Sequence, residues 1–338
     1  MFTWLRDETF SIGGQTRTVS IYRNEVFAAA LDLGTSESAL DVEFVHVPGG
    51  SFSMGSSDDE RAIMVESGAV ESRLEDERPQ HVVDVPSFFV ARVEVTQRLW
   101  RAFADRAALP PEPSFFARAG ETAPVETVSW EQARQWLASI NRNHGSTLRL
   151  PSESEWEYAA RSGSDATLYN GDMVPLGQAN APELDPIAWY MGNSGVDYTG
   201  AIDSSRWPEK QIDHQNAGVL PVGEKRPNAF GLFDMLGNVM EWCEDEAHAN
   251  YIGAPNDGST WIGGDTISGN IENGPAAQVP ERCAVVETPD VPGRMRRGGS
   301  YRNFAYNTRN AIRSLRGPRF CDSNQGFRIA ASLLEELR

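Results

Sequence analysis

The chain is poor in cysteine, in positive charge and in long apolar runs, and each shortage excludes a class of protein. Its 338 residues contain three widely spaced cysteines, Cys243, Cys283 and Cys321, so we expect reduced, buried thiols rather than a disulfide framework or a metal-binding C-x-x-C pair. The formal net charge of -18 argues against general nucleic-acid binding and against binding to anionic membranes, because both require a basic face. A run of about 18 apolar residues, which a membrane helix needs, does not occur, and residues 1–13 lack an apolar leader, so we expect a soluble, cytoplasmic protein.

Common catalytic motifs are also missing. The sequence has no G-x-x-x-x-G-K-[ST], no G-x-S-x-G and no H-E-x-x-H. Its five histidines are isolated from one another, whereas a facial iron site needs two of them and a carboxylate to converge. These histidines are His46, His81, His144, His214 and His248.

The residues that are abundant indicate a mixed fold with many turns. Nine tryptophans, 30 glycines and 20 prolines suggest irregular backbone held by large aromatic side chains. Strand patterns at Thr9–Ile12 and Thr16–Tyr22 flank Gly13-Gly14, which predicts a hairpin in an N-terminal extension, residues 1–40. Residues 41–334 then form the main domain, in which 246–293 is a long irregular insertion.

Helix signals are few but specific. Thr96 precedes one apolar-periodic segment, and Ser129 with Gln132 and Ser152 with Glu155 form capping boxes ahead of two more. Glu153, Glu155 and Glu157 cluster at a helix start, where we expect them to cap the helix and to interact with its dipole, and paired acid–base carboxylates are the alternative. The acidic stretch 56–78 reads as a surface loop. Short strands, two or three helices and long loops together predict an α+β fold.

A series of blocks in order resembles the formylglycine-generating enzyme family, also called sulfatase-modifying factor. The blocks include Leu150-Pro151-Ser152-Glu153, Gly237-Asn238-Val239-Met240-Glu241-Trp242, Arg297-Gly298-Gly299-Ser300 and Gly326-Phe327-Arg328, and they span about 290 residues. Further blocks lie at 44–55, 79–83, 94–96, 124–130, 221–223 and 227–236. The resemblance implies a single α+β domain related to C-type lectins, with little regular secondary structure and usually with bound calcium.

The same resemblance locates where the family's chemistry would be. Formylglycine-generating enzymes use two cysteines after the Gly-Gly-Ser motif to bind copper(I), but here Asn303 matches the first by offset and Asn307 or Thr308 lies closest to the second. Neither an amide nor a hydroxyl replaces a soft thiolate. The related sulfoxide synthases take iron from an H-x-x-x-H-x-E motif that this chain lacks. We therefore expect no copper or iron.

Calcium ligands are implied by resemblance. One site would use oxygens of Gly237, Asn238 and Glu241, and another would use Asn193 and Ser194, with Asp213 as a further ligand. Amide, carboxylate and backbone oxygens suit calcium, although local hydrogen bonding without metal explains the same residues.

The segment 294–328 is basic in an otherwise acidic chain. It carries nine arginines and one acid, Asp322. By their family positions Arg297, Arg309, Arg313 and Arg328 form buried ion pairs with the acidic body. The other candidates would contact a peptide, a protein or a small anionic ligand, because guanidinium groups interleaved with aromatic rings suit such ligands. These candidate contacts are Tyr301, Arg302, Asn303, Phe304, Tyr306, Arg316 and Arg319, with Trp242 as a groove wall.

Two functions remain open at this point. The first is a non-catalytic, pseudoenzyme-like module that binds a protein, a peptide or an anionic ligand through the C-terminal segment. The alternative is an iron- or copper-dependent oxidase or oxygenase of the same family, whose ligands are not evident in the sequence.

Overall fold

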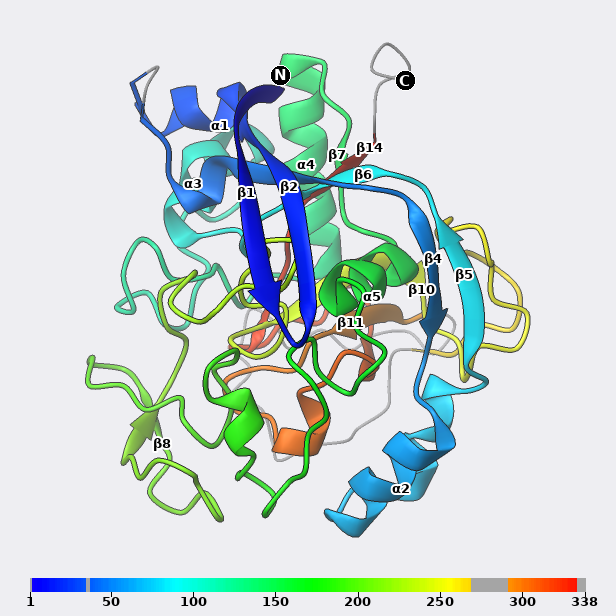
Figure 1. Ribbon diagram of the computed structural model, residues 1–338. Helices are drawn as coiled ribbons and strands as arrows, with labels where there is room; N and C mark the ends of the chain where they lie inside the picture. The colour runs from blue at the N-terminus through cyan, green and yellow to red at the C-terminus, as the bar shows by residue number, and fades with distance from the viewer. Residues whose placement is uncertain (1, 35–36, 269–290, 333–338) are drawn as a thin grey trace.

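The first and last strands of the chain belong to the same sheet. The structure, a computed structural model, describes residues 2–34, 37–268 and 291–332. Its largest sheet has six strands, and every neighbouring pair is antiparallel. In spatial order these strands are β1 (Phe2–Ile12), β2 (Gln15–Asn24), β3 (Glu43–Val47), β6 (Phe88–Ala91), β14 (Ala330–Ser332) and β7 (Leu148–Arg149) (Figure 1).

A second sheet carries the arginine-rich segment. Its order is β12 (Arg313–Arg316), β11 (Arg294–Arg297), β10 (Met240–Glu246) and β13 (Gln325–Gly326). β13 pairs with β10 in parallel, whereas the other two pairs are antiparallel. Two-stranded ladders join β4 (Gly50–Met54) to β5 (His81–Val85), and β8 (Ile202–Asp203) to β9 (Asn216–Ala217).

Five α-helices are described, which is more than the two or three that the sequence predicted. They are α1 (Glu25–Ala30), α2 (Asp58–Glu66), α3 (Gln97–Ala104), α4 (Trp130–His144) and α5 (Glu153–Arg161). Single 3₁₀ turns are η1 (Leu40–Val42), η2 (Glu71–Arg73), η3 (Glu75–Glu77), η4 (Asp105–Ala107), η5 (Pro182–Leu184) and η7 (Ala305–Asn307). Helices α3, α4 and α5 begin at the caps read from the sequence, and the boxes of Ser129 and Ser152 are both complete. The mixed α+β class is confirmed.

The prediction of a loop over 56–78 was wrong. Ser57 caps α2 by accepting a hydrogen bond from the Glu60 backbone N–H, and three acids occupy the first turn, where the helix dipole favours them. Helix α2 has only a weak periodicity of apolar residues. In the sequence, its N-cap Ser57 was therefore the one signal that could have predicted it. Its residues Glu60 and Arg61 are buried.

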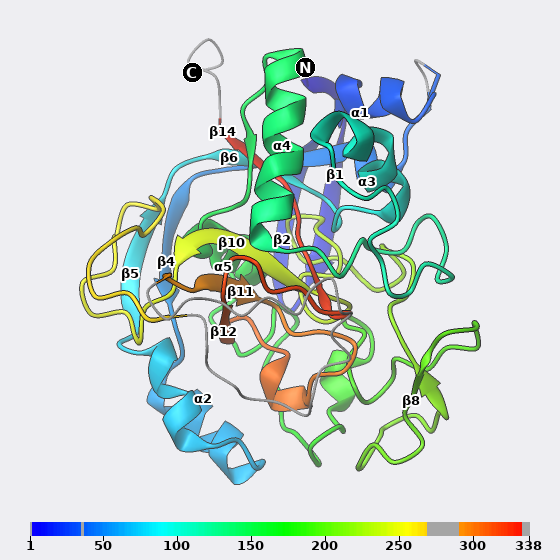
Figure 2. The same cartoon turned by 180° about the vertical axis from the view of Figure 1, so that it is seen from behind.

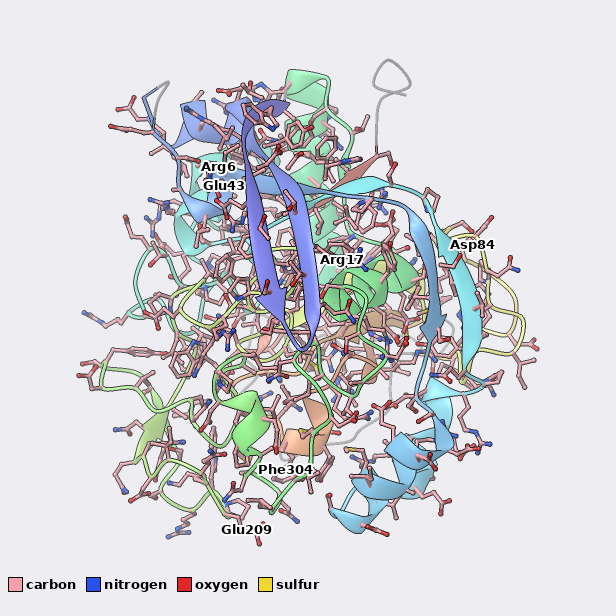
Figure 3. All side chains as sticks on the ribbon, in the orientation of Figure 1. Arg6, Arg17, Glu43, Asp84, Glu209 and Phe304 are labelled. Atoms are coloured by element: carbon pink, nitrogen blue, oxygen red, sulfur yellow. The ribbon has the colours of Figure 1, made fainter. Side chains whose placement is uncertain are left out.

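The N-terminal hairpin extends the large sheet rather than standing apart from it. β2 pairs with β3, and the Arg6 guanidinium donates to both Glu43 carboxylate oxygens at 3.0 and 3.1 Å (Figure 3). At the tip, Gly13 has a φ of +56°, and a Cβ there would lie 2.5 Å from the Tyr169 carbonyl oxygen. A glycine is required at this position because the turn rests on the backbone of another loop.

Side chains alternate between the two faces along each strand, and in the central strands β3 and β6 the side chains of both faces are mostly buried. Helices α1, α3 and α4 lie on one face of the large sheet (Figure 2). Phe44 and Phe89 pack there in a cluster with Trp100 and Trp136, whose rings stack with centres 5.8 Å apart. The opposite face packs with α5, a helix that also contacts β4, β5, β10 and β11. Helix α5 therefore brings its acidic first turn against the arginine-rich sheet.

Between β10 and β11 the described residues, 247–268 and 291–293, form turns and isolated bridges. The rest of the predicted insertion, 269–290, lies outside the described residues, as do the final residues of the predicted main domain. The division into an extension and a main domain stays a prediction.

Candidate functional site

The Arg297-Gly298-Gly299-Ser300 turn leads from β11 into the predicted contact segment. Gly298 and Gly299 have φ values of +93° and +78°, and a Cβ on Gly299 would lie 2.6 Å from the Asn307 carbonyl oxygen. The turn thus needs glycine for both its conformation and its close packing. On the β11–β12 ladder, Arg296 lies opposite Ser314 and Arg297 lies opposite Arg313.

Four arginines of the segment are buried and paired with carboxylates, as the sequence predicted. The Arg309 guanidinium donates to Glu60 at 2.7 Å and to Glu77 at 2.6 Å, and that of Arg328 donates to both oxygens of Glu241 at 2.6 Å. The remaining pairs join Arg297 to Glu153 and Glu157, and Arg313 to Glu153. We call these the matched arginines: Arg297, Arg309, Arg313 and Arg328.

Glu153, at the start of α5, shows how strong this pairing is. Burial alone would raise the pKa of its carboxyl group, but Arg313 and Arg297 outweigh burial and lower the pKa to about 2. Arg313 approaches it at 2.7 and 2.9 Å, and Arg297 at 2.8 Å. Glu153 therefore holds two guanidinium groups in the core.

Arg296 is also buried, at 4% exposure, but its hydrogen-bond partners are neutral. One Nη donates to the Gln325 amide oxygen, the other donates to the Ser314 hydroxyl at 2.8 Å, and the guanidinium lies 5.8 Å from the Trp242 ring centre. No carboxylate forms an ion pair with it within the described part of the chain. Burial, followed by repulsion from Arg316 and Arg302, lowers the pKa of Arg296 well below its usual value, and Asp322 only partly offsets this.

Two half-buried arginines, Arg302 and Arg316, repel the charge of Arg296. Arg302 pairs with Asp322 and donates to the Asn324 amide oxygen at 3.1 Å. Arg316 donates to a backbone carbonyl at 2.9 Å and lies 5.4 Å from the Phe320 ring centre. We call Arg296, Arg302 and Arg316 the three-arginine cluster.

Three further predicted contacts, Asn303, Phe304 and Tyr306, follow Arg302 in the chain. The Ser300 hydroxyl donates to the Asn303 amide oxygen and accepts from Asn324 at 3.0 Å. Phe304 and Tyr306 are half-buried, with ring centres 5.4 Å apart. In Figure 3, Phe304 is labelled toward the opposite end of the molecule from Arg6.

Three of the predicted contacts lie elsewhere. Tyr301 is fully buried, and its ring packs edge-on against Phe116 with centres 5.3 Å apart. Trp242 is also fully buried, so it is no groove wall and reaches the site only as the ring beneath Arg296. Arg319 is exposed and lies 3.2 Å from the Glu131 carboxylate at the start of α4. Tyr301 and Trp242 are therefore core residues, which corrects their prediction as ligand contacts.

In the calcium site predicted at Asn193, Ser194 and Asp213, each side chain already has a partner within the protein. The Asn193 amide oxygen accepts a backbone hydrogen bond of 3.0 Å, and the Ser194 hydroxyl donates to the Tyr301 carbonyl at 2.6 Å. Asp213 lies at the surface, where its side chain is 85% exposed and pairs with Lys210 at 3.3 Å. The three side-chain oxygens do not converge.

In the calcium site predicted at Gly237, Asn238 and Glu241, these residues likewise bind other groups of the protein. The Gly237 backbone packs on Trp189, and the Asn238 amide oxygen accepts a backbone N–H at 3.1 Å. Both Glu241 oxygens bind Arg328. These residues do not fit a calcium ion here, and calcium stays a prediction.

The histidines and cysteines are dispersed. In the described ranges, no three His, Cys, Asp or Glu side chains are grouped in a way that could hold a metal ion. Cys243 is a buried thiol whose pKa burial raises well above its usual value. Cys321 is disulfide-bonded, which corrects the expectation that all three thiols are reduced, and Cys283 lies outside the described residues.

Two hollows in the surface of the described chain lie away from these residues. A shallow depression of about 500 Å³ is lined by Asp84 and Asp257, and another of about 360 Å³ is lined by Arg106 and His144. Neither depression includes a predicted contact. Among the helices of the described chain, none is both long and apolar enough to cross a membrane.

The two sheets, the capped helices and the Gly-Gly turn define an α+β fold of the formylglycine-generating enzyme type. The chain belongs to the family described as sulfatase-modifying factor enzyme 1-like domain, whose match covers residues 32–333.

Relatives within this family have different names. The chain is 30% identical over 218 residues to the chaperone protein LppX of Paenibacillus barcinonensis, covering 54% of this chain and 70% of LppX. It is 25% identical over 302 residues to a formylglycine-generating enzyme of Mycobacterium tuberculosis, covering 71% and 89% of the two chains.

Solved structures agree on the fold. PvdO from Pseudomonas aeruginosa has a TM-score of 0.57 at 26% identity, covering 87% of this chain and 96% of PvdO. Variable protein 1 of Treponema denticola has a TM-score of 0.55 at 20% identity, covering 97% and 99%, and shows the fold alone.

Sequence reasoning missed Arg296. Side chains alternate along a strand, so Arg296 and Arg297 on β11 must point to opposite faces. Since Arg297 was predicted to point to the acidic interior, Arg296 could have been predicted to point to the opposite face, away from those carboxylates. That alternation was the signal available.

Proposed function

We propose that this chain is a non-catalytic, ligand-binding member of its family, whose segment 301–320 recognises an acidic group on a peptide or protein. The observation that carries the proposal is the contrast within the segment. In the arginine-rich segment 294–328, four arginines are paired with carboxylates in the core, whereas Arg296 is buried against the neutral side chains of Gln325 and Ser314. Guanidinium groups of this kind suit carboxylate and phosphate ligands.

The aromatic pair supports recognition of a peptide or protein. Phe304 and Tyr306 are half-buried beside the polar network of Ser300 and Asn303. Aromatic and arginine side chains contribute much of the binding energy at protein interfaces. The relative named as a chaperone protein also supports a protein or peptide partner.

Copper chemistry of the formylglycine-generating kind has no thiol at the matching position. Asn303 occupies it and is hydrogen-bonded to Ser300. Of the described cysteines, Cys243 is buried in the core and Cys321 is in a disulfide. Neither offers the thiolate that copper(I) requires.

The disulfide also bears on location. Disulfides persist in oxidising compartments and are rare in the reducing cytoplasm. The cytoplasmic location predicted from the sequence therefore conflicts with Cys321, and we infer an oxidising compartment instead.

Binding to an array of short peptides of varied charge would test the proposal. We expect acidic peptides to bind, and we expect the double change Phe304→Ala and Tyr306→Ala to weaken binding about tenfold or more. Val174→Ala, a change of an exposed side chain outside the segment, is the control. Stoichiometric iron or copper together with oxygen consumption would contradict the proposal and favour the oxidase alternative.

A further inference from the structure

Arg296 differs from the other buried arginines in what neutralises its charge. Its neighbour Arg297 is equally inaccessible and binds two carboxylates. Arg296 binds an amide oxygen and a hydroxyl, which carry no net charge. The Nε atoms of both residues lack a partner in the described chain, so the missing carboxylate, and not a single orphan atom, sets Arg296 apart.

Burying a cation without a neighbouring anion destabilises a fold, because the charge loses its hydration and gains no ion pair. A single acidic side chain beside Arg296 would have removed this penalty. The chain has 48 acidic residues against 30 basic ones, and Gln325, which binds Arg296, differs from glutamate only by an amide. Arginine does not lose its proton inside proteins, so the charge persists when the group is buried. The cation–π contact with Trp242 attracts the guanidinium but does not neutralise it.

The surroundings of Arg296 add positive charge. Arg316 and Arg302 are the charged groups that act on it most unfavourably, and Asp322 is the acid that acts on it most favourably. Asp322 is already used, because one oxygen binds Arg302 and the other accepts the Ser323 backbone N–H at 2.7 Å. Asp322 therefore does not form an ion pair with Arg296.

The hydrogen-bonding groups at this position also suit an oxyanion. The Ser314 hydroxyl accepts from Arg296 at 2.8 Å, which leaves its own proton to donate. Arg302 and Arg316 are half-buried, so the cluster extends from partly exposed side chains to the buried Arg296. Charge-assisted hydrogen bonds from several donors are the usual means of holding carboxylate or phosphate.

We propose that Arg296, with Ser314 as a second donor and with Arg302 and Arg316 as neighbouring cations, binds one oxyanion, a carboxylate or a phosphate group. This site deepens the proposed function and rests on it, since the oxyanion would be the acidic group of the recognised ligand. Arg296 would then be the buried anchor, and Phe304 and Tyr306 would contact the remainder of the ligand.

Thermal unfolding in the presence of small anions tests the site without knowledge of the ligand. The full chain is titrated with sodium phosphate or sodium acetate, with sodium chloride holding the ionic strength constant. We expect a saturable rise in Tm, roughly 2–4 °C when the anion exceeds its Kd about tenfold. A rise with phosphate alone identifies a phosphate-type ligand, and a rise with acetate alone identifies a carboxylate.

Variants locate the effect. Arg296→Met should abolish the rise in Tm, Arg296→Lys should keep part of it, and the exposed Arg101→Met should keep all of it. If Arg296→Met fails to fold, the comparison of Arg296→Lys with Arg101→Met still tests the site. A rise in Tm that is smaller in the lysine variant supports it, and an equal rise in both variants contradicts it. No saturable rise in the wild type, or an unchanged rise in folded Arg296→Met, would overturn the site.

This experiment separates the two proposals. A rise in Tm without peptide binding would keep the oxyanion site and refute peptide recognition. Peptide binding that is insensitive to Arg296→Met, with no rise in Tm, would keep the function and refute the site.

Discussion

Arg296 and Arg297 are consecutive on β11, yet they represent two ways of burying the same charged group. Arg297 points to α5, where Glu153 and Glu157 meet it, and Arg296 points to the opposite face, where Gln325 and Ser314 meet it. A buried ion pair is strongly destabilised by loss of one partner, because the other charge is left unpaired. The first environment is thus complete within the fold, and the second is complete only with an anion.

The largest expected effect comes from removing the carboxylate that two matched arginines share. Glu153→Gln leaves Arg297 and Arg313 without their common partner, so we expect a loss of about 3–5 kcal/mol in the free energy of unfolding. Chemical denaturation at pH 7 measures it. A loss below about 1 kcal/mol would show that the pairs do not stabilise the fold.

The pH dependence of the same residue follows from its pKa. Because the folded pKa of Glu153 is lowered to about 2, its stabilising effect is present above its ordinary value of 4.5 and is lost as the pH falls toward 2. The difference in stability between wild type and Glu153→Gln should therefore shrink in acid. A constant difference from pH 7 to pH 2.5 would contradict the lowered pKa.

Glu126 offers the acidic counterpart of Arg296, a buried charge that lacks an ion pair in the described structure. Burial raises its pKa to about 7, although hydrogen bonds from Thr127 and from the Phe116 backbone partly oppose this. For a raised pKa, the contribution to stability is present below the ordinary value of 4.5 and is lost as the pH rises through 7.

Glu126→Gln removes this titration. Relative to the wild type, the variant should gain about 3 kcal/mol in stability between pH 4.5 and pH 8. Denaturation at these two pH values checks it, and Glu131→Gln, at an exposed position, is the control. A gain no larger than that of the control would mean that Glu126 titrates normally.

Gln325→Glu would convert the Arg296 environment into that of Arg297. The new carboxylate would accept from Arg296 as the amide oxygen does, but the amide's donation to the Phe320 carbonyl would be lost, so we expect a net gain of about 1 kcal/mol without added anion and loss of any response to phosphate. Thermal unfolding with and without phosphate measures both quantities. A destabilised variant that still responds to phosphate would separate Gln325 from the site.

The smallest expected effect is at Arg319. Its side chain is 62% exposed and its partner Glu131 is 46% exposed, so Arg319→Ala should change stability by less than about 1 kcal/mol. The same variant should weaken acidic-peptide binding if Arg319 contacts the ligand. A loss of stability above this range would assign it a structural role.

Local features of this fold could be predicted from the sequence. The caps at Thr96, Ser129 and Ser152 act within three or four residues, and the Gly13-Gly14 turn joins adjacent strands. Such interactions leave a pattern in a single stretch of chain. The matched arginines could be predicted as a class because family positions marked them as buried.

Their partners could not be predicted, because the contacts cross the whole chain. Arg309 binds Glu60, 249 residues away, on a helix that the sequence analysis assigned to a loop. Trp242 and Tyr301 were misassigned for the same reason, since burial depends on what packs over a ring. The neutral partners of Arg296 are evident only in the folded structure, because Gln325 and Ser314 come from two other strands, β13 and β12.

The most direct measurement of the central claim is the free energy of unfolding of Arg296→Met and Arg297→Met, side by side, in buffer free of oxyanions. We expect Arg297→Met to lose about 3–5 kcal/mol, because Glu153 and Glu157 lose a partner, and we expect Arg296→Met to be as stable as the wild type or more stable. Equal losses in the two variants would contradict the claim that Arg296 is a buried cation awaiting an anion.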